Sequence, residues 1–254
     1  MNASPDSGSR AEVARWGFGV DAVTRHSILR QAIAISVSLV PFGIAFGVAC
    51  TKAGLDWPQA LAFSSLVFTG GSQFAAVGVL GDGGSAFAAI IAGLLLAIRS
   101  LIYGIVMTPW LRGSIVFRVF ASQLMIDESL AVSTAQTEEV GPRRFGYVAA
   151  GLSVFIFWNV STLVGSLAFS NAGSFVTDWG IDATIPAAFA ALLWPRLVDR
   201  EQRQVALIGA LIALSFVPLV PPGFPIVLSG VAVVFGFRRR NGAKRNADRA
   251  GGQS

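Results

Sequence analysis

Hydrophobic residues in this chain come in long, nearly unbroken runs that short polar stretches separate. A helix needs roughly 20 mostly apolar residues to cross the hydrocarbon core of a bilayer. The runs therefore predict an all-α polytopic membrane protein with about eight transmembrane segments (seven to eight), some of them short or broken. The expected segments are residues 28–50, 58–80, 86–111, 114–135, 146–169, 183–197, 205–219 and 225–237.

Both ends of the chain are polar. Residues 1–27 carry Pro, Gly, Ser and scattered charges without an apolar core, so we expect a cytoplasmic tail and not a cleaved signal peptide. Residues 238–254 are basic and Gly-rich and form a second cytoplasmic tail, which leaves 28–237 as the transmembrane domain. The last three segments are shorter than a straight span, which predicts half-helices or tightly paired hairpins among them.

Composition supports this class of protein. The chain has 254 residues, of which 54% are hydrophobic and 13% charged, with a mean hydropathy of +0.65. A soluble domain carries about 25% charged residues. The chain therefore has no room for a separate soluble domain.

The basic residues indicate an orientation. If eight segments start from an inner N-terminus, only Lys52 and Arg112 lie outside, Arg99 and Arg118 fall within segments, and the other basic residues lie inside. This asymmetry is the positive-inside pattern, so we expect a multi-pass inner-membrane protein with both termini cytoplasmic. It also explains the isoelectric point near 10.3 without nucleic-acid binding, and the basic tail is expected to touch anionic lipid.

The second segment contains a polar, glycine-rich centre, Thr69 to Gln73 (TGGSQ). Adjacent Gly70 and Gly71 each weaken a helix by about 1 kcal/mol relative to Ala. Transporters use broken helices of this kind to aim backbone N–H groups at a substrate near the midplane. The alternative is a flexible helix whose small residues serve close packing. For Gly43 and Gly47 in the first segment, helix packing is the favoured interpretation.

Four more polar residues lie inside expected segments: Arg99 in the third, Asp127 and Glu128 in the fourth, and Asn159 in the fifth. A charge at membrane depth is costly and should face a partner or a cavity. Two roles for Arg99 remain open, a structural ion pair with Asp127 or Glu128 and the binding of a substrate carboxylate. Adjacent residues point about 100° apart on a helix, so at most one of the two acids faces Arg99 squarely.

Several kinds of chemistry have no support in the sequence. The chain has no phosphate-binding G-x-x-x-x-G-K-[ST] loop, no G-x-S-x-G and no H-E-x-x-H motif. It has one cysteine, Cys50, and one histidine, His26, in the polar leader, so no Cys/His cluster can hold zinc. We expect neither an enzyme nor a metal or cofactor site.

Five sequence elements occur in order along the chain: PFGIAFG at 41–47, FTGGSQF at 68–74, IRSLIYG at 98–104, DESLA at 127–131 and GIDATIPAAF at 180–189. Together they resemble the AzlC family of bacterial branched-chain amino acid permeases, over about residues 30–237. Two departures are Ala97, where the family often has Asn, and Ser100, where it often has His, so the surroundings of Arg99 are less polar than in the family pattern.

The resemblance implies export of branched-chain amino acids (Leu, Ile, Val class) by a secondary-active permease subunit. It also implies a small hydrophobic AzlD-type partner subunit. A passive channel and a scaffold subunit without its own pathway are the alternatives.

The expected mechanism uses the polar residues inside the segments. Amide donors of the broken helix bind the amino acid's carboxylate, Arg99 adds positive potential, and Asp127 or Glu128 receives the ammonium or a coupling proton. Phe74 and Trp158 are expected to contact the apolar side chain. The predicted substrate and pathway residues are Gly70, Gly71, Ser72, Gln73, Arg99, Asp127, Glu128 and Asn159.

Overall fold

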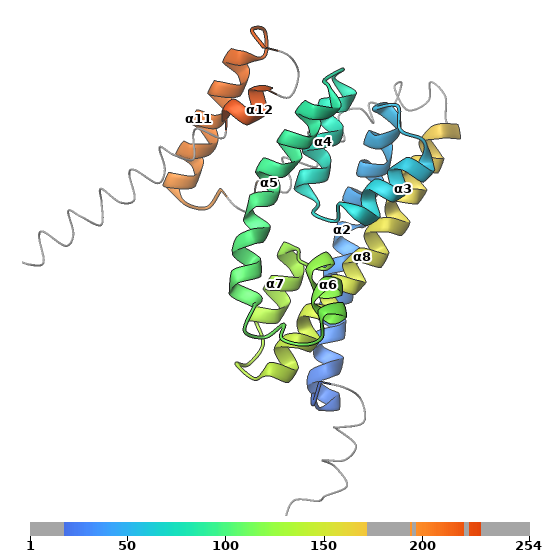
Figure 1. The fold of residues 1–254 in the computed structure, drawn as a ribbon, viewed down its shortest axis with the longest axis vertical. Helices are drawn as coiled ribbons and strands as arrows, with labels where there is room; N and C mark the ends of the chain where they lie inside the picture. The colour runs from blue at the N-terminus through green and yellow to red at the C-terminus, as the bar shows by residue number, and fades with distance from the viewer. Residues whose placement is uncertain (1–17, 172–193, 195–196, 221–223, 230–254) are drawn as a thin grey trace, which may run out of the picture.

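The computed structural model describes residues 18–171, 194, 197–220 and 224–229. All the secondary-structure elements within these residues are helices. Three helices are long and apolar enough to cross a membrane: α2 (Ala22–Lys52), α5 (Ala86–Met107) and α8 (Val140–Asn171). Figure 1 shows all three running along the length of the molecule, with pairs of shorter helices between them. The prediction of an all-helical membrane protein is confirmed, whereas a count of seven or eight spans is not.

Part of the predicted organisation lies beyond the described residues. This part contains the segment 183–197 except residues 194 and 197, and the segment 225–237 from residue 230 on. It also contains both polar tails except residues 18–27. The predicted segment 205–219 corresponds to α11 (Arg200–Phe216), and α12 (Phe224–Ser229) lies near the start of the last segment.

α2 and α8 form a parallel pair that is the spine of the described fold. A Cβ atom added at Gly43 would lie 2.7 Å from the Cβ of Ser161, and one at Gly47 would run into the carbonyl of Thr162. Gly165 on α8 approaches the carbonyl of Ile44 in the same way. Small residues that let helix backbones approach closely are the usual basis of packing in membranes, so the packing interpretation of Gly43 and Gly47 is confirmed.

The second expected segment is not one crossing helix but a hairpin, which we call hairpin 1. It consists of α3 (Trp57–Leu66), which an Asp56–Gln59 capping box starts, and α4 (Gly71–Gly81). A Cβ on Gly81 would lie 3.9 Å from the Cβ of Ala53, directly after α2. The chain therefore enters and leaves hairpin 1 at the same end of the molecule (Figure 1).

The fourth expected segment is also a hairpin, hairpin 2, made of α6 (Ile115–Gln123) and α7 (Asp127–Thr134). At its start, the guanidinium of Arg144 lies 4.5 Å from the ring centroid of Phe117. At its end, the hydroxyl of Ser133 donates to the carbonyl of Arg143 at 2.9 Å. Both ends of hairpin 2 thus adjoin the first turns of α8, at the opposite end of the molecule from the ends of hairpin 1 (Figure 1).

This arrangement corrects the predicted position of Arg112, whereas Arg118 lies near the start of the fourth segment as predicted. The first turns of α2 and α8 share one end, because the rings of Phe18 and Phe145 are 5.9 Å apart. The loop with Arg112, expected on the outer side, and the start of α6 with Arg118 lie at this same end. The prediction failed because a hairpin and a crossing helix of equal length have the same hydropathy, although they leave the membrane on different sides.

Candidate functional site

The tips of the two hairpins meet in the middle of the molecule. The side-chain amide of Gln123, the last residue of α6, donates to the carbonyl of Ser65 in α3 at 2.6 Å. The hydroxyl of Ser65 donates to the Oδ1 of Asn159 on α8 at 2.8 Å. Because α3 and α6 enter from opposite ends, this contact joins two half-helices at mid-height beside α8 (Figure 1).

The side chain of Gln73 holds the turn at the tip of hairpin 1 in place by hydrogen bonds to the backbone on both sides of it. Gly70 has φ of +64°, a conformation that glycine adopts without steric cost, and its N–H donates to the Oε1 of Gln73 at 3.1 Å. The Nε2 of the same side chain donates to the carbonyl of Ser64 in α3 at 3.2 Å. The predicted break in the helix is therefore confirmed, between Leu66 and Gly71. The side chain of Gln73 connects the two helices on either side of the break.

At the tip of hairpin 2, a serine makes the corresponding hydrogen bonds across the turn. The hydroxyl of buried Ser129 accepts from the N–H of Ile126 at 3.1 Å and donates to the carbonyl of Leu124 at 2.7 Å. We did not predict this break. A signal was present, because Asp127 and Glu128 are acidic residues of the kind that stabilise a helix N-terminus.

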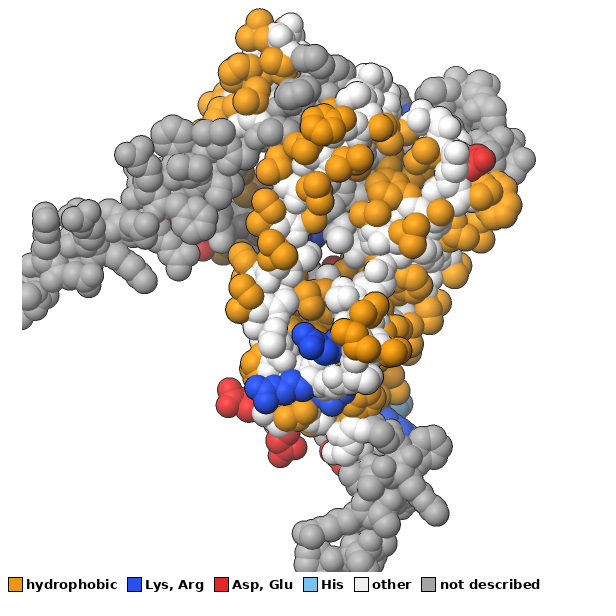
Figure 2. Space-filling view, in the orientation of Figure 1, with side chains coloured by type: hydrophobic (Ala, Val, Ile, Leu, Met, Phe, Trp, Pro, Cys, Tyr) orange, Lys and Arg blue, Asp and Glu red, His pale blue; other side chains and the backbone are white. Residues whose placement is uncertain are grey.

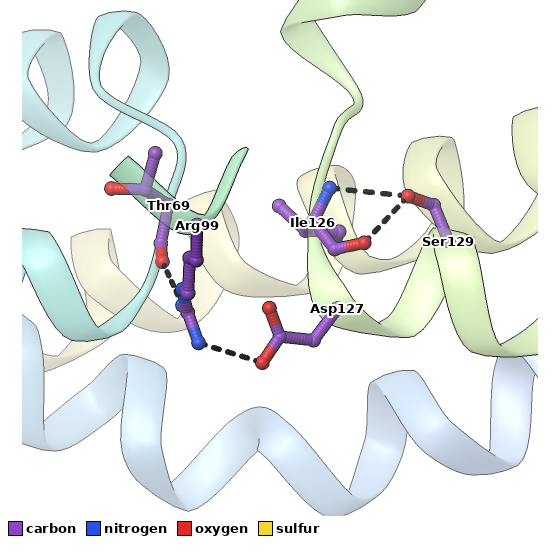
Figure 3. Close-up of polar contacts among 5 residues, drawn as sticks. All are labelled: Thr69, Arg99, Ile126, Asp127 and Ser129. Atoms are coloured by element: carbon purple, nitrogen blue, oxygen red, sulfur yellow. Dashed lines mark hydrogen bonds and ion pairs between the residues drawn. The ribbon is translucent and has the colours of Figure 1, made fainter. Parts of the chain in front are cut away.

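Arg99 on α5 joins the two tips (Figure 3). Its Nη1 lies 2.7 Å from the Oδ2 of Asp127 in an ion pair, and its Nη2 donates to the carbonyl of Thr69 at 3.0 Å. The side chain of Arg99 is 35% exposed and that of Asp127 is 17% exposed, so a ligand could reach both. Of the two predicted acids, the carboxylate that contacts the guanidinium is that of Asp127.

Two helix N-termini adjoin this ion pair. α4 starts at Gly71, where an added Cβ would lie 3.9 Å from the Nη2 of Arg99, and α7 starts at Asp127. The first N–H groups of a helix lack partners inside the helix, and they carry a partial positive charge. Together with Arg99 they can receive an anion, while Asp127 offers the one carboxylate seen to contact Arg99.

The other predicted site residues have different surroundings. Gln73 and Asn159 are bound to backbone and side-chain groups of hairpin 1 and α8, and Asn159 also donates to the carbonyl of Phe155 at 2.8 Å. The hydroxyl of Ser72 is buried and has no hydrogen-bond partner among the described residues. Glu128 follows Asp127 in the first turn of α7.

Phe74 and Trp158, expected to contact the substrate's side chain, lie in the core. Their rings meet edge to face at 6.2 Å, and both pack on Phe46. Both are at most 5% exposed, so they support the wall of α2, α4 and α8 behind the junction and do not open onto its surface.

Comparison with known proteins identifies relatives. The family model described as "AzlC protein" matches residues 34–171, which include both hairpins and α5. The chain is 26% identical over 201 residues to "Inner membrane protein YgaZ" of Escherichia coli, with 73% of this chain and 79% of that protein covered. It is 28% identical over 203 residues to an "Uncharacterized membrane protein" of Archaeoglobus fulgidus, covering 77% and 87%. No solved structure matches.

Proposed function

Because this chain belongs to the AzlC family, a family of membrane proteins, we propose that it exports branched-chain amino acids as the pathway-bearing subunit of a secondary-active permease. The family and its relatives point to membrane transport in general. The choice of substrate rests on the resemblance to branched-chain amino acid permeases and on the chemistry of the junction between the two hairpins.

The observation that carries the proposal is the Arg99–Asp127 ion pair at the meeting point of the hairpin tips. An α-amino acid at neutral pH is a zwitterion, with one carboxylate and one ammonium attached to the same carbon atom. Such a ligand can insert between Arg99 and Asp127 and replace one ion pair by two. The exchange leaves no charge without a partner at membrane depth, where an unpaired charge is costly.

In the proposed complex, the substrate's carboxylate binds Arg99 and the N–H groups of Gly71 and Ser72 at the start of α4, which have no hydrogen-bond partner among the described residues. Its ammonium binds Asp127. This uses the positive end of one half-helix for the anion, as broken helices of transporters do. Arg99 thereby has both roles that the sequence left open, a structural pair without substrate and a carboxylate ligand with it.

The arrangement of the hairpins supports a carrier more than a channel. Hairpin 1 enters from one end and hairpin 2 from the other, and Gln123, Ser65 and Arg99 bind the tips to each other. A substrate held at the junction is therefore covered by one hairpin on each side. We propose that export requires each hairpin to withdraw in turn, with both termini cytoplasmic and an AzlD-type small subunit as partner.

The experiment is efflux of labelled Leu, Ile, Val and Met from loaded cells with and without this gene, followed by competition in proteoliposomes. We expect faster efflux with the gene, abolished by a protonophore. Unlabelled leucine should compete, whereas its amide, which lacks the carboxylate, and its 2-oxo analogue, which lacks the ammonium, should not. Efflux that ignores the protonophore would indicate a channel, and equal competition by all three compounds would contradict recognition of a zwitterion.

A further inference from the structure

A cavity lies between the last turns of α5 and hairpin 2, and its lining extends from Met125, near the hairpin junction, to Arg112 and Arg118 at the end of the molecule. Its volume is about 570 Å³. One part of its lining is polar or basic and the other is apolar. The residues that matter here are Thr108, Arg112, Arg118, Ser122, Leu101 and Ile105.

The two arginines give this cavity a net positive charge. Among the described residues, neither Arg112 nor Arg118 makes an ion pair or a side-chain hydrogen bond. The hydroxyls of Thr108 and Ser122 donate to carbonyls of their own helices, at 2.6 and 2.7 Å. The guanidinium groups are therefore the side chains that remain available as donors to a ligand.

In contrast to Arg112 and Arg118, the neighbouring arginines at this end of the molecule do contact aromatic or acidic side chains. The guanidinium of Arg143 lies 4.4 Å from the ring centroid of Trp110 and 3.8 Å from a carboxylate oxygen of Glu138, and Arg144 lies over Phe117. Figure 2 shows basic side chains gathered at this end, beside hydrophobic ones. Arg112 and Arg118 are the ones that line the cavity.

The surroundings place the cavity at the edge of the apolar surface. Ile102, Val116 and Val119, on the same two helices, are exposed, as expected for residues that face lipid. Arg118 is four residues past Ser114, about 6 Å along the helix at 1.5 Å per residue, so its long side chain can reach the interface. The cavity thus combines interfacial cations with apolar walls.

We propose that this cavity binds the headgroup of an anionic phospholipid, with the phosphate between Arg112 and Arg118 and an acyl chain along Leu101 and Ile105. Basic pockets between helices near a membrane surface are suited to such headgroups. None of the described residues that line the cavity is Asp or Glu, so the ammonium of an amino acid or of phosphatidylethanolamine has no partner among them. The ligand is therefore an anion without a cation, and the site is distinct from the zwitterion site at Arg99.

The test is photocrosslinking of purified protein in nanodiscs with a photoreactive phosphatidylglycerol, and with the phosphatidylethanolamine analogue for comparison. The test variant is Arg112→Gln/Arg118→Gln. The matched control, Arg30→Gln/Arg200→Gln, removes two exposed arginines that do not line the cavity. We expect crosslinks from the anionic lipid to the peptide 101–125, at least fivefold weaker in the test variant and unchanged in the control.

Two results would overturn the proposal. Equal crosslinking of this peptide in the test variant and the wild type would show that the arginines do not bind the headgroup. Loss of the crosslink in the presence of millimolar leucine would assign the cavity to the transport pathway. If the double variant does not fold, the two single variants and competition on the wild type by unlabelled phosphatidylglycerol against phosphatidylethanolamine decide the question, with equal competition as the contradicting result.

Discussion

Hairpin 1 and hairpin 2 both stabilise a tight turn between two short helices with side chain–backbone hydrogen bonds, but they use different residues. In each, the side chain of the third residue of the second helix, Gln73 or Ser129, accepts from the N–H three residues earlier, at Gly70 or Ile126, and donates to a carbonyl at or near the end of the first helix. Hairpin 1 makes its turn with a glycine at positive φ, whereas hairpin 2 turns without any glycine.

The difference lies in what each tip presents to Arg99. Hairpin 1 presents the carbonyl of Thr69 and, one residue after Gly70, the free amides of a helix start. Hairpin 2 presents the carboxylate of Asp127. The two tips therefore have equivalent frames but complementary chemistry, one suited to an anion and the other to a cation.

Removing Arg99 should have the largest effect on this pairing of the tips. Arg99→Ala and Asp127→Asn should each lower transport at least tenfold, which corresponds to about 1.4 kcal/mol. The double variant should lose at least as much transport as either single variant, because each residue binds a different group of the substrate in the proposed complex. It should nevertheless be more abundant than Arg99→Ala, because it leaves no carboxylate without its ionic partner. Arg99→Ala alone should also lower abundance, since it leaves the Asp127 carboxylate without the guanidinium.

The measurement is efflux rate and membrane abundance for both single variants and the double variant, with Arg99→Lys as the control that keeps the charge but loses the planar fork. A double variant that is no more abundant than Arg99→Ala would contradict the structural ion pair. Wild-type kinetics in Arg99→Ala would remove Arg99 from the site altogether.

Removing the side-chain hydrogen bonds of Gln73 and Ser129 within the hairpins should have the next largest effect, on the free energy of unfolding. Gln73→Leu leaves the N–H of Gly70 and the carbonyl of Ser64 without their partner, at about 1–3 kcal/mol for each buried group. Ser129→Ala removes one acceptor from the N–H of Ile126, which still reaches the carbonyl of Leu124 at 3.1 Å, so it should cost less, about 1 kcal/mol. Thermal unfolding in detergent should rank Gln73→Leu below Ser129→Ala, with Ser38→Ala, an exposed serine on α2, near wild type. The reverse order would contradict the larger contribution of the Gln73 hydrogen bonds.

The two adjacent glycines of hairpin 1 should differ from each other. Gly70→Ala forces a Cβ into the left-handed region and should cost about 1–2 kcal/mol, although the space around it is open. Gly71→Ala meets Arg99 at an ordinary contact distance and should be nearly neutral in stability. Gly71→Leu should instead reach the guanidinium and reduce transport without loss of protein. Equal melting temperatures for Gly70→Ala and Gly71→Ala would refute this distinction.

The sequence predicted the break in hairpin 1 because its cause is local. Gly70 is where the backbone needs a positive φ, and Gly71 leaves room for Arg99. The ionic partner of Arg99 was narrowed to Asp127 and Glu128 because they are the nearest candidate acids in the sequence, and helix geometry then allowed at most one of them to face the guanidinium squarely. The break in hairpin 2 was missed because Leu124 to Ile126 contain neither Gly nor Pro, and the tie made by Ser129 depends on tertiary placement.

The side on which each hairpin leaves the membrane could not be read from hydropathy. Residues 58–80 and 114–135 are each long enough to cross, and turning both crossings into hairpins leaves the loop before α8 on the same side as before. The charge pattern held one hint, since Arg112 was an exception to the positive-inside rule in the eight-segment arrangement and ceases to be one in the observed fold.

The most direct test of the two opposed hairpins is the accessibility of single cysteines to an impermeant thiol reagent in whole cells. The natural Cys50 is buried and is replaced by Ala, and cysteine is placed in turn at Lys52, Asp82, Arg112 and Thr137. The fold predicts that positions 52 and 82 react alike, that 112 and 137 react alike, and that the two pairs lie on opposite sides. Position 82 reacting opposite to 52, together with 112 reacting opposite to 137, would restore two crossing helices and contradict the hairpins.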